Sequence, residues 1–340
     1  MASMKILFDH PWPFLLAHGG FQIQIEQTKG ALERRGVGVE YLRWWDDAQR
    51  GQIIHYFGRP GADYIHFAQA KGMKVVAAEL LTGLGSRSAK ARFVQKSLMR
   101  ATQAALPKSF TSRLAWDSYK KADAFVALTE WEASLMREMF DADAAKVHVI
   151  PNGVEEVFFL APPDVTRDAN GDRLVCTAVI HPRKRVLELA QAAVHAKVPL
   201  WIIGKPYAES DAYYRTFLDV QKANSDLIRY EGGISDRARL AGIYRQARGF
   251  ALLSTQESLS LSALEAAAAK CPLLLSDLPW ARTVFGAAAR YADGSIPPEN
   301  LAPALRDFYE KAPAMKPSFV PLTWDDVAGK FQNLYASLLA

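Results

Sequence analysis

Cysteine and long apolar runs are both scarce in this chain of 340 residues. Its two cysteines, Cys176 and Cys271, lie in apolar stretches typical of buried strands, which favours reduced core thiols over a disulfide framework. No uncharged apolar run reaches about 18 residues, the length that a membrane-spanning helix needs. The first residues also lack the apolar core of a signal peptide. These absences predict a cytoplasmic protein.

Internal repeats, low-complexity tracts and heptad patterns are absent as well, which excludes solenoid, fibrous and coiled-coil architectures. Half of the residues are apolar and 23% are charged, a composition typical of globular proteins. A chain of this length suits two domains of about 150 residues each.

The net charge of +5 is unevenly distributed. Residues 1–152 contain 20 basic and 15 acidic side chains, whereas the remainder contains 21 of each. Residues 80–116 contain seven basic side chains and no acidic one. Such a surface indicates anionic lipid, nucleic acid or an anionic substrate, and the alternative is a merely solvated face.

Short β-rich runs alternate with helical stretches in both halves, which predicts parallel strands joined by crossover helices. A polar, turn-rich stretch at 159–171 separates the halves, and an amphipathic helix is expected at 324–339. The sequence therefore predicts an α/β chain with two doubly wound sheets. We expect strands at 5–8, 37–42, 52–57, 74–78, 124–128 and 147–150, and then at 174–179, 200–203, 228–230, 250–253 and 273–276.

The clearest chemical signal is a loop at 256–265, which follows a strand and opens an alanine-rich helix. Its backbone N–H groups and the helix N-terminus would bind an anion such as a diphosphate. Glu257 and Glu265 are placed so that one carboxylate could bind a hexose and the other a ribose. In the alternative interpretation, Ser262 and Glu265 form a capping box, and Glu265 is structural.

A second signal is the run Arg183, Lys184 and Arg185 between the strand at 174–179 and a helix. These cations would lie in the first helical turn, where the helix dipole disfavours positive charge unless an anion binds there. We therefore expect a phosphate at this turn, and the alternative is an exposed basic turn. Both signals follow strands of one sheet, so they should converge at its carboxyl edge.

Three segments resemble the family 4 retaining glycosyltransferases of the GT-B fold. Residues 122–130 with 147–154 resemble the family's domain junction, 257–265 its two-glutamate motif, and 226–235 the strand and turn that contact the base. The resemblance implies two Rossmann-like doubly wound domains that face each other across a cleft. They would comprise residues 1–152 and 153–322, with the C-terminal helix at 323–340 crossing back to the first domain.

The resemblance also implies an activity. The chain would transfer a sugar from a nucleoside-diphosphate-sugar to a hydroxyl acceptor with retention of configuration, in glycan or glycolipid assembly, without a metal or other cofactor. Two alternatives stay open. One is a nucleotide-sugar 2-epimerase of the same fold, and the other is a non-catalytic subunit that binds sugar nucleotides.

By the same resemblance, Glu257 would contact the donor sugar, Glu265 would bind the nucleotide ribose, and Lys184 with Arg183 would neutralise the leaving diphosphate. The other nucleotide-binding positions would be Ser258, Leu259, Ser260, Leu261, Gly204, Gly233 and Ile234 in the second domain, and Gly19 and Gly20 in the first.

The sequence departs from the family in three places. Ser258 and Ser260 replace loop glycines, and a side chain there narrows the approach of a phosphate. Ala178 and Val179 replace a Gly-Arg pair, so Arg183 or Arg185 must supply the second cation.

The third departure is a missing active-site histidine, because residues 78–81 read Ala-Glu-Leu-Leu. His10 and His55 are possible replacements, although a lone histidine at a strand end is more often structural. Asp141 and Asp143 match a metal-binding Asp-x-Asp pattern, but they fall in a polar turn away from the inferred site, and we expect no metal there.

The resemblance implies that the first domain receives the acceptor, and the basic segment lies in that domain. We therefore expect a glycan or lipid-linked acceptor and peripheral contact between residues 84–116 and the inner face of an anionic membrane. We expect no nucleic acid partner. The alternative is a solvated helix and a soluble acceptor.

Overall fold

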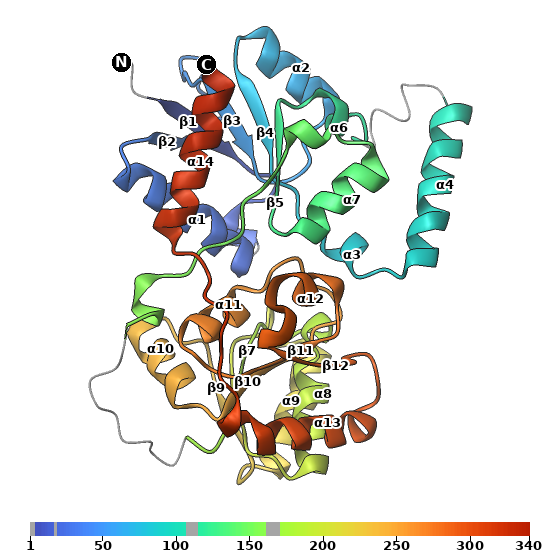
Figure 1. Cartoon of the computed structure of the whole chain (residues 1–340), viewed down its shortest axis with the longest axis vertical. Helices are drawn as coiled ribbons and strands as arrows, with labels where there is room; N and C mark the ends of the chain where they lie inside the picture. Colours follow the sequence, from blue (N-terminus) through green and yellow to red (C-terminus); the bar gives the residue numbers. More distant parts are fainter. Residues whose placement is uncertain (1–3, 17–18, 107–114, 161–170) are drawn as a thin grey trace. The chain divides into compact units, whose positions relative to one another are not determined.

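The computed structural model describes residues 4–16, 19–106, 115–160 and 171–340. The chain forms two compact units, residues 1–153 with 324–340 and residues 154–323 (Figure 1). Each unit is built on a parallel six-stranded sheet with helices, so the predicted α/β class with two Rossmann-like domains is confirmed. Lys108, Arg113 and most of the predicted linker lie outside the described residues.

The sheet of the first unit has the strand order β2-β1-β3-β4-β5-β6. Every neighbouring pair is parallel, as the alternation of strands and helices predicts. The central strands are apolar along most of their length because helices cover both faces. The strands are β1 (Lys5–Asp9), β2 (Gly38–Tyr41), β3 (Ile53–Tyr56), β4 (Lys74–Ala77), β5 (Ala124–Ala127) and β6 (Val147–Val149).

The C-terminal helix α14 (Trp324–Leu339) packs on α1 (Gly20–Arg34) in the first unit, as Figure 1 shows. Arg35 directly after α1 forms an ion pair of 2.8 Å with Asp325. The Tyr335 hydroxyl lies 2.6 Å from His55 Nδ1 in the core. The other helices of this unit are α2 (Ala62–Ala70), α3 (Thr82–Gly85), α4 (Ala89–Ala105), α6 (Ser118–Lys121) and α7 (Glu130–Phe140), with 3-10 turns η1 (Phe14–Leu16) and η3 (Ala144–Lys146).

The sheet of the second unit has the order β12-β11-β10-β7-β8-β9, again with parallel neighbours. The chain runs from β7 outward to β9 and then returns to β10 on the other side of β7. The carboxyl ends of β7 and β10 therefore flank the topological switch point, where open α/β sheets bind ligands. The strands are β7 (Leu174–Thr177), β8 (Leu200–Ile203), β9 (Ile228–Glu231), β10 (Gly249–Leu252), β11 (Leu273–Ser276) and β12 (Arg290–Ala292).

The edge strand β12 is the one strand among those described that the sequence pattern does not predict. Cys176 in β7 and Cys271 before β11 are buried free thiols, as expected. The helices of the second unit are α8 (Val186–Ala196), α9 (Ala212–Ala223), α10 (Arg237–Gln246), α11 (Leu261–Ala268), α12 (Pro279–Phe285) and α13 (Pro298–Lys311), with 3-10 turns η4 (Glu156–Phe158), η5 (Pro182–Lys184), η6 (Gly286–Ala288) and η7 (Ala312–Ala314).

In the part of the chain that the structure describes, no helix is both long and apolar enough to cross a bilayer.

Candidate functional site

The loops after β7 and β10 meet at the carboxyl edge of the second sheet. The Thr255 amide donates a hydrogen bond of 2.9 Å to the carbonyl of Arg183, which fixes one loop against the other. Glu257 and the two cations of the first loop are thereby brought together, as the sequence predicts.

A buried ion pair forms the centre of this edge. Glu257 is only 8% exposed, and its Oε1 accepts a hydrogen bond from Lys184 Nζ. Arg183 Nη1 lies 3.5 Å from Glu257 Oε2 and donates to the Gln256 carbonyl at 2.7 Å. Arg185 instead donates to the Ile296 carbonyl at 2.8 Å. Of the two candidates for a second cation, the structure therefore brings Arg183 to Glu257.

The three cations do not occupy the first turn of α8, and that prediction is wrong. Arg183 and Lys184 belong to the 3-10 turn η5, in which the Arg183 amide donates to His181 Nδ1 at 3.2 Å. Arg185 adopts a left-handed conformation with φ of 51°, so α8 begins only at Val186. Because this separate turn precedes α8, the side chains of Arg183 and Lys184 contact the loop after β10 and do not lie on the surface of α8.

The capping box that Ser262 suggested does not form at Glu265. The N-cap of α11 is Ser260, whose Oγ accepts from the Ala263 amide at 3.3 Å, and Ser262 lies inside the helix. The capping-box interpretation is therefore wrong. Glu265 is 6% exposed and accepts a hydrogen bond from Tyr244 at 3.4 Å.

Arg237 is the main partner of Glu265, and the sequence alone does not reveal it. Its guanidinium forms ion pairs with Glu265 and, at 2.7 Å, with Glu155, and it lies 4.8 Å from the Phe158 ring centre. Burial raises the pKa of Glu265, and the positive charge of Arg237 opposes this shift. No motif distinguishes Arg237 from the other arginines, so only the fold reveals this network.

The predicted diphosphate loop combines buried side chains with the N-terminus of α11. Ser258, Leu259 and Ser260 are buried. The amides of Leu261 and of the next residue lie at the start of α11, where an α-helix has no partner for its N–H groups. Ser260 in place of a glycine caps the helix, which gives this departure from the family a structural reason.

Two glycines and one isoleucine of the predicted nucleotide site lie at the ends of β8 and β9. Gly204 has a φ of 155°, and a Cβ there would lie 1.9 Å from the Ala178 carbonyl oxygen, so only glycine allows the two strand ends to approach. Gly233 is exposed and Ile234 is half-buried. A Cβ at Gly233 would lie 3.3 Å from Lys205 Cε, which places another cation beside this turn.

Gly19 and Gly20 belong to the first unit, where Gly19 directly precedes α1 and Gly20 is its first residue. Gly19 is the N-cap of α1, and its φ of 132° lies in a region that favours glycine. A Cβ at Gly19 would meet nothing within 4 Å among the described residues, so the space beside this backbone is open.

The structure gives His55 and His10 different surroundings. His55 is fully buried against Phe57, with ring centres 4.2 Å apart, and burial lowers its pKa to about 3. His55 is therefore a core residue. His10 stacks on Phe14 at the carboxyl end of β1, and its Nδ1 lies 2.7 Å from the Trp12 carbonyl oxygen.

Glu79 occupies the end of β4, where the family pattern has a histidine. It accepts hydrogen bonds from Arg59, at 2.7 Å, and from Tyr119. Asp141 lies 3.6 Å from Arg100, and Asp143 accepts from the Ala145 amide at 3.0 Å. Among the residues described, no group of three or more His, Cys, Asp or Glu side chains could hold a metal ion.

Two family models match the chain. Residues 19–153 match the Glycosyl transferase 4-like domain, and residues 171–311 match the Glycosyl transferases group 1 model.

Curated relatives align with part of the chain. A D-inositol 3-phosphate glycosyltransferase of Kineococcus radiotolerans is 28% identical over 212 residues, which are 54% of this chain and 48% of the relative. A GDP-mannose:cellobiosyl-diphosphopolyprenol alpha-mannosyltransferase of Komagataeibacter xylinus is 27% identical over 252 residues, 65% of this chain and 57% of the relative. The chain thus spans about half the length of these relatives.

Solved structures share the fold over almost the whole chain. The Anabaena protein HepE in complex with UDP and glucose has a TM-score of 0.70 at 14% identity, covering 98% of this chain and 100% of that one. Sucrose-phosphate synthase from Thermosynechococcus elongatus has a TM-score of 0.68 at 16% identity, covering 99% of each chain. At such identities the likeness concerns the fold alone.

Proposed function

The chain belongs to the family 4 glycosyltransferases of the GT-B fold, and we propose that it transfers a sugar from a nucleoside-diphosphate-sugar to a hydroxyl acceptor with retention of configuration. The product would be a glycan or glycolipid.

One observation carries this proposal. Lys184 and Arg183 gather around the buried carboxylate of Glu257 at the switch point of the second sheet. When a donor binds, its diphosphate supplies the negative charge that these cations and the N-terminus of α11 attract. Glu257 is then free to accept hydrogen bonds from the sugar hydroxyls. A parallel sheet binds its ligand at this same edge.

The chemistry then rests on the leaving group. Bond cleavage at the anomeric carbon leaves negative charge on the diphosphate, and the two cations stabilise that charge as it develops. Glu265 lies further along α11, where its carboxylate can accept hydrogen bonds from ribose hydroxyls. Positioning of donor and acceptor supplies the remaining rate enhancement.

Incubation with a panel of nucleotide sugars, with and without glycan acceptors, tests the proposal. We expect free nucleoside diphosphate and a new glycosidic product that keeps the anomeric configuration of the donor. A C2 epimer formed without acceptor would identify a 2-epimerase. Binding of nucleoside diphosphates in a thermal-shift screen without any turnover would identify a non-catalytic subunit.

We predict that transfer survives an excess of EDTA. Lys184, Arg183 and the amides of α11 supply the positive charge that a divalent cation supplies in other transferases. Initial rates should be the same with EDTA and with added Mg²⁺. Complete loss of rate on chelation, restored by Mg²⁺, would contradict this assignment and return attention to Asp141 and Asp143.

The acceptor side of the proposal involves α4, at the periphery of the first unit (Figure 1). Arg92 lies 4.7 Å from the Trp131 ring centre, and Lys96 donates to the Glu138 carbonyl, so both cations face the protein. Phe93 and Leu98 of α4 are 73% and 63% exposed, and Val94 between them in the sequence is 55% exposed. An anionic bilayer would therefore meet exposed apolar side chains together with the exposed cations Arg87 and Lys90, whereas Arg100 lies 3.6 Å from Asp141.

This arrangement supports a lipid-linked or otherwise anionic acceptor. The names of both curated relatives described above contain a phosphate-bearing compound. Amphipathic helices with apolar and basic side chains adsorb to anionic interfaces.

We predict that the protein co-sediments with vesicles of anionic lipid and that binding weakens as salt rises. The double variant Phe93→Ser with Leu98→Ser should bind the vesicles more weakly than wild type at every salt concentration, because these side chains supply the apolar contact. Phe67→Ser, at an exposed aromatic on α2, is the matched control. Wild-type protein that does not bind anionic vesicles at low salt would contradict the proposed membrane contact.

A further inference from the structure

The loop at residues 42–50, which we term the tryptophan loop, follows β2 and carries two consecutive exposed indoles. Trp44 is 75% exposed and Trp45 is 83% exposed. Large aromatic side chains in such a position are the residues that contribute most to binding interfaces. The loop lies at the carboxyl edge of the first sheet, the edge at which the Gly19 loop also lies.

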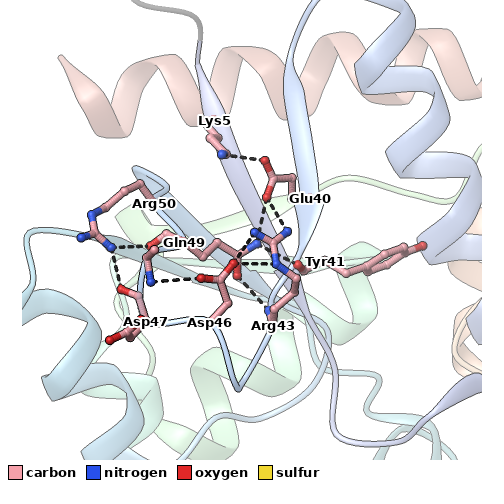
Figure 2. A network of polar contacts seen from close by, with 9 residues as sticks. Lys5, Glu40, Tyr41, Arg43, Asp46, Asp47, Gln49 and Arg50 are labelled. Carbon is pink, nitrogen blue, oxygen red and sulfur yellow. Dashed lines mark hydrogen bonds and ion pairs between the residues drawn. The ribbon is translucent and has the colours of Figure 1, made fainter.

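A polar network holds this loop in one conformation, as Figure 2 shows. The Arg43 guanidinium donates to Glu40 at 2.9 Å and to Asp46 at 2.6 Å, on either side of the indoles. The Gln49 side chain accepts from the Arg43 amide at 2.8 Å and donates to the Tyr41 carbonyl at 3.0 Å. Hydrogen bonds on both sides of Trp44 and Trp45 therefore fix the backbone of the turn that contains them.

The network is also attached to the sheet. Lys5 in β1 lies 2.6 Å from Glu40 Oε1, while Arg43 and Gln49 both donate to Glu40 Oε2. These contacts lower the pKa of Glu40 to about 2, with Lys5 as the largest cause, so the carboxylate stays ionised even in mildly acidic solution. A loop ordered before binding loses less conformational entropy when it binds, which favours a ligand-binding role over a passive turn.

Charge around the loop indicates the ligand class. The network and its neighbours contain three cations and three anions, so the net formal charge is zero and neither an anionic bilayer nor a polyanion is favoured. Asp47 and Arg50 in the same loop are exposed. Arg50 Nη1 donates to the Asp47 and Gln49 carbonyls, and the Asp47 carboxylate and the other guanidinium N–H groups can hydrogen-bond to hydroxyl groups. The charged residues are Lys5, Arg43, Arg50, Glu40, Asp46 and Asp47.

Sugar rings match this combination. The face of an indole carries negative charge density and attracts the weakly positive C–H groups on one face of a pyranose. Carboxylate and guanidinium groups at the edge bind the hydroxyls. A lipid chain or an apolar protein surface would not use Asp47 and Arg50, and it would leave them desolvated.

A second aromatic group adjoins the loop. His10 and Phe14, in the segment after β1, stack on each other and both contact the edge of Tyr41 at the end of β2, with ring centres 6.2 and 6.1 Å away. Trp12 in this segment is 64% exposed. Aromatic side chains therefore also lie at the carboxyl ends of β1 and β2, next to the start of the tryptophan loop.

We propose that Trp44 and Trp45 form a glycan subsite that binds sugar units of the acceptor beyond the unit that carries the reacting hydroxyl. The identification of the ligand as an acceptor rests on the proposed function, whereas the binding of a neutral glycan does not. The preformed loop sets the length and orientation of the glycan that the first unit accepts.

The test begins with the protein alone, without a nucleotide sugar. Linear tetrasaccharides of glucose, mannose and galactose are titrated by calorimetry and by saturation-transfer NMR. We expect at least one to bind, and Trp44→Ala with Trp45→Ala to weaken that binding about tenfold or more. Phe67→Ala is the matched control and should leave affinity unchanged. No binding by the whole panel, or equal binding by the double variant, would overturn the proposal.

Vesicle and self-association measurements separate the other occupants. If the double variant changed vesicle co-sedimentation or the sedimentation coefficient while glycan affinity stayed the same, the loop would be a membrane or protein contact and the proposal would be wrong. If the protein binds tetrasaccharides through Trp44 and Trp45 but transfers no sugar, the subsite stands and the proposed function fails.

Discussion

Replacing Lys184 with alanine should slow sugar transfer by roughly 30- to 1,000-fold, equal to about 2–4 kcal/mol in the barrier. Lys184 is 15% exposed at its side chain and pairs with Glu257. Lys184 is the more buried of the two cations, because the Arg183 side chain is 33% exposed and lies 3.5 Å from Glu257. In the variant, the negative charge that develops on the leaving diphosphate would therefore lack its more buried partner. Single-turnover rates with saturating donor measure this effect directly.

Controls separate the chemical effect from a folding defect. Removing Lys184 leaves the buried Glu257 carboxylate with only Arg183 of the two cations, which lowers stability by about 1–3 kcal/mol. Lys184→Arg retains a cation and should recover part of the rate, whereas Lys184→Met should not, although both fill the site. Arg183→Ala should cost less than Lys184→Ala. Near-normal turnover in folded Lys184→Ala protein would place the phosphate site elsewhere.

Hydrophobic pattern predicts most of this fold because each sheet repeats one local unit. Buried strands such as β8 and β11 contain apolar runs, and they coincide with the predicted ranges at 200–203 and 273–276. The edge strand β12 has the sequence Arg-Tyr-Ala, which has no pattern that distinguishes it from a loop. It is a strand only because β11 offers an unpaired edge.

Local conformation limits what the sequence can predict at the site. Residues 181–185 contain a proline followed by three cations. This pattern fits the start of a helix as well as it fits a separate turn. The left-handed backbone at Arg185 ends η5 and starts α8 one residue later. That conformation depends on tertiary contacts, among them the hydrogen bond of Arg185 to the Ile296 carbonyl.

Partners from distant segments cannot be predicted from the sequence. Glu265 is identified by its spacing from Glu257, but Arg237 comes from α10 and Glu155 from the segment before η4. The same limit applies to α4, where the run of basic residues is apparent in the sequence but its orientation is not. Arg92 and Lys96 lie on the same inward side of α4 as Met99. The helical repeat shows that these residues share one side, but it does not show that this side packs against α7.

Glu265→Gln should weaken binding of the nucleoside diphosphate by roughly 10- to 100-fold, as expected for loss of a hydrogen bond to a charged group. Glu257→Gln should leave this affinity nearly unchanged and lower the transfer rate, because the partner of Glu257 is the sugar. Calorimetry with the nucleoside diphosphate alone separates the two variants.

The network around Arg237 supplies the control for this last experiment. Glu155 and Glu265 both pair with Arg237, so a defect that acts only through the position of Arg237 should appear in Glu155→Gln as well. We expect Glu155→Gln to bind the nucleotide within about threefold of wild type, because its carboxylate is not assigned to the ribose. Equal losses in the two variants would make Glu265 a positioning residue for Arg237. A ribose contact requires that Glu265→Gln alone lose affinity while its melting temperature stays close to that of Glu155→Gln.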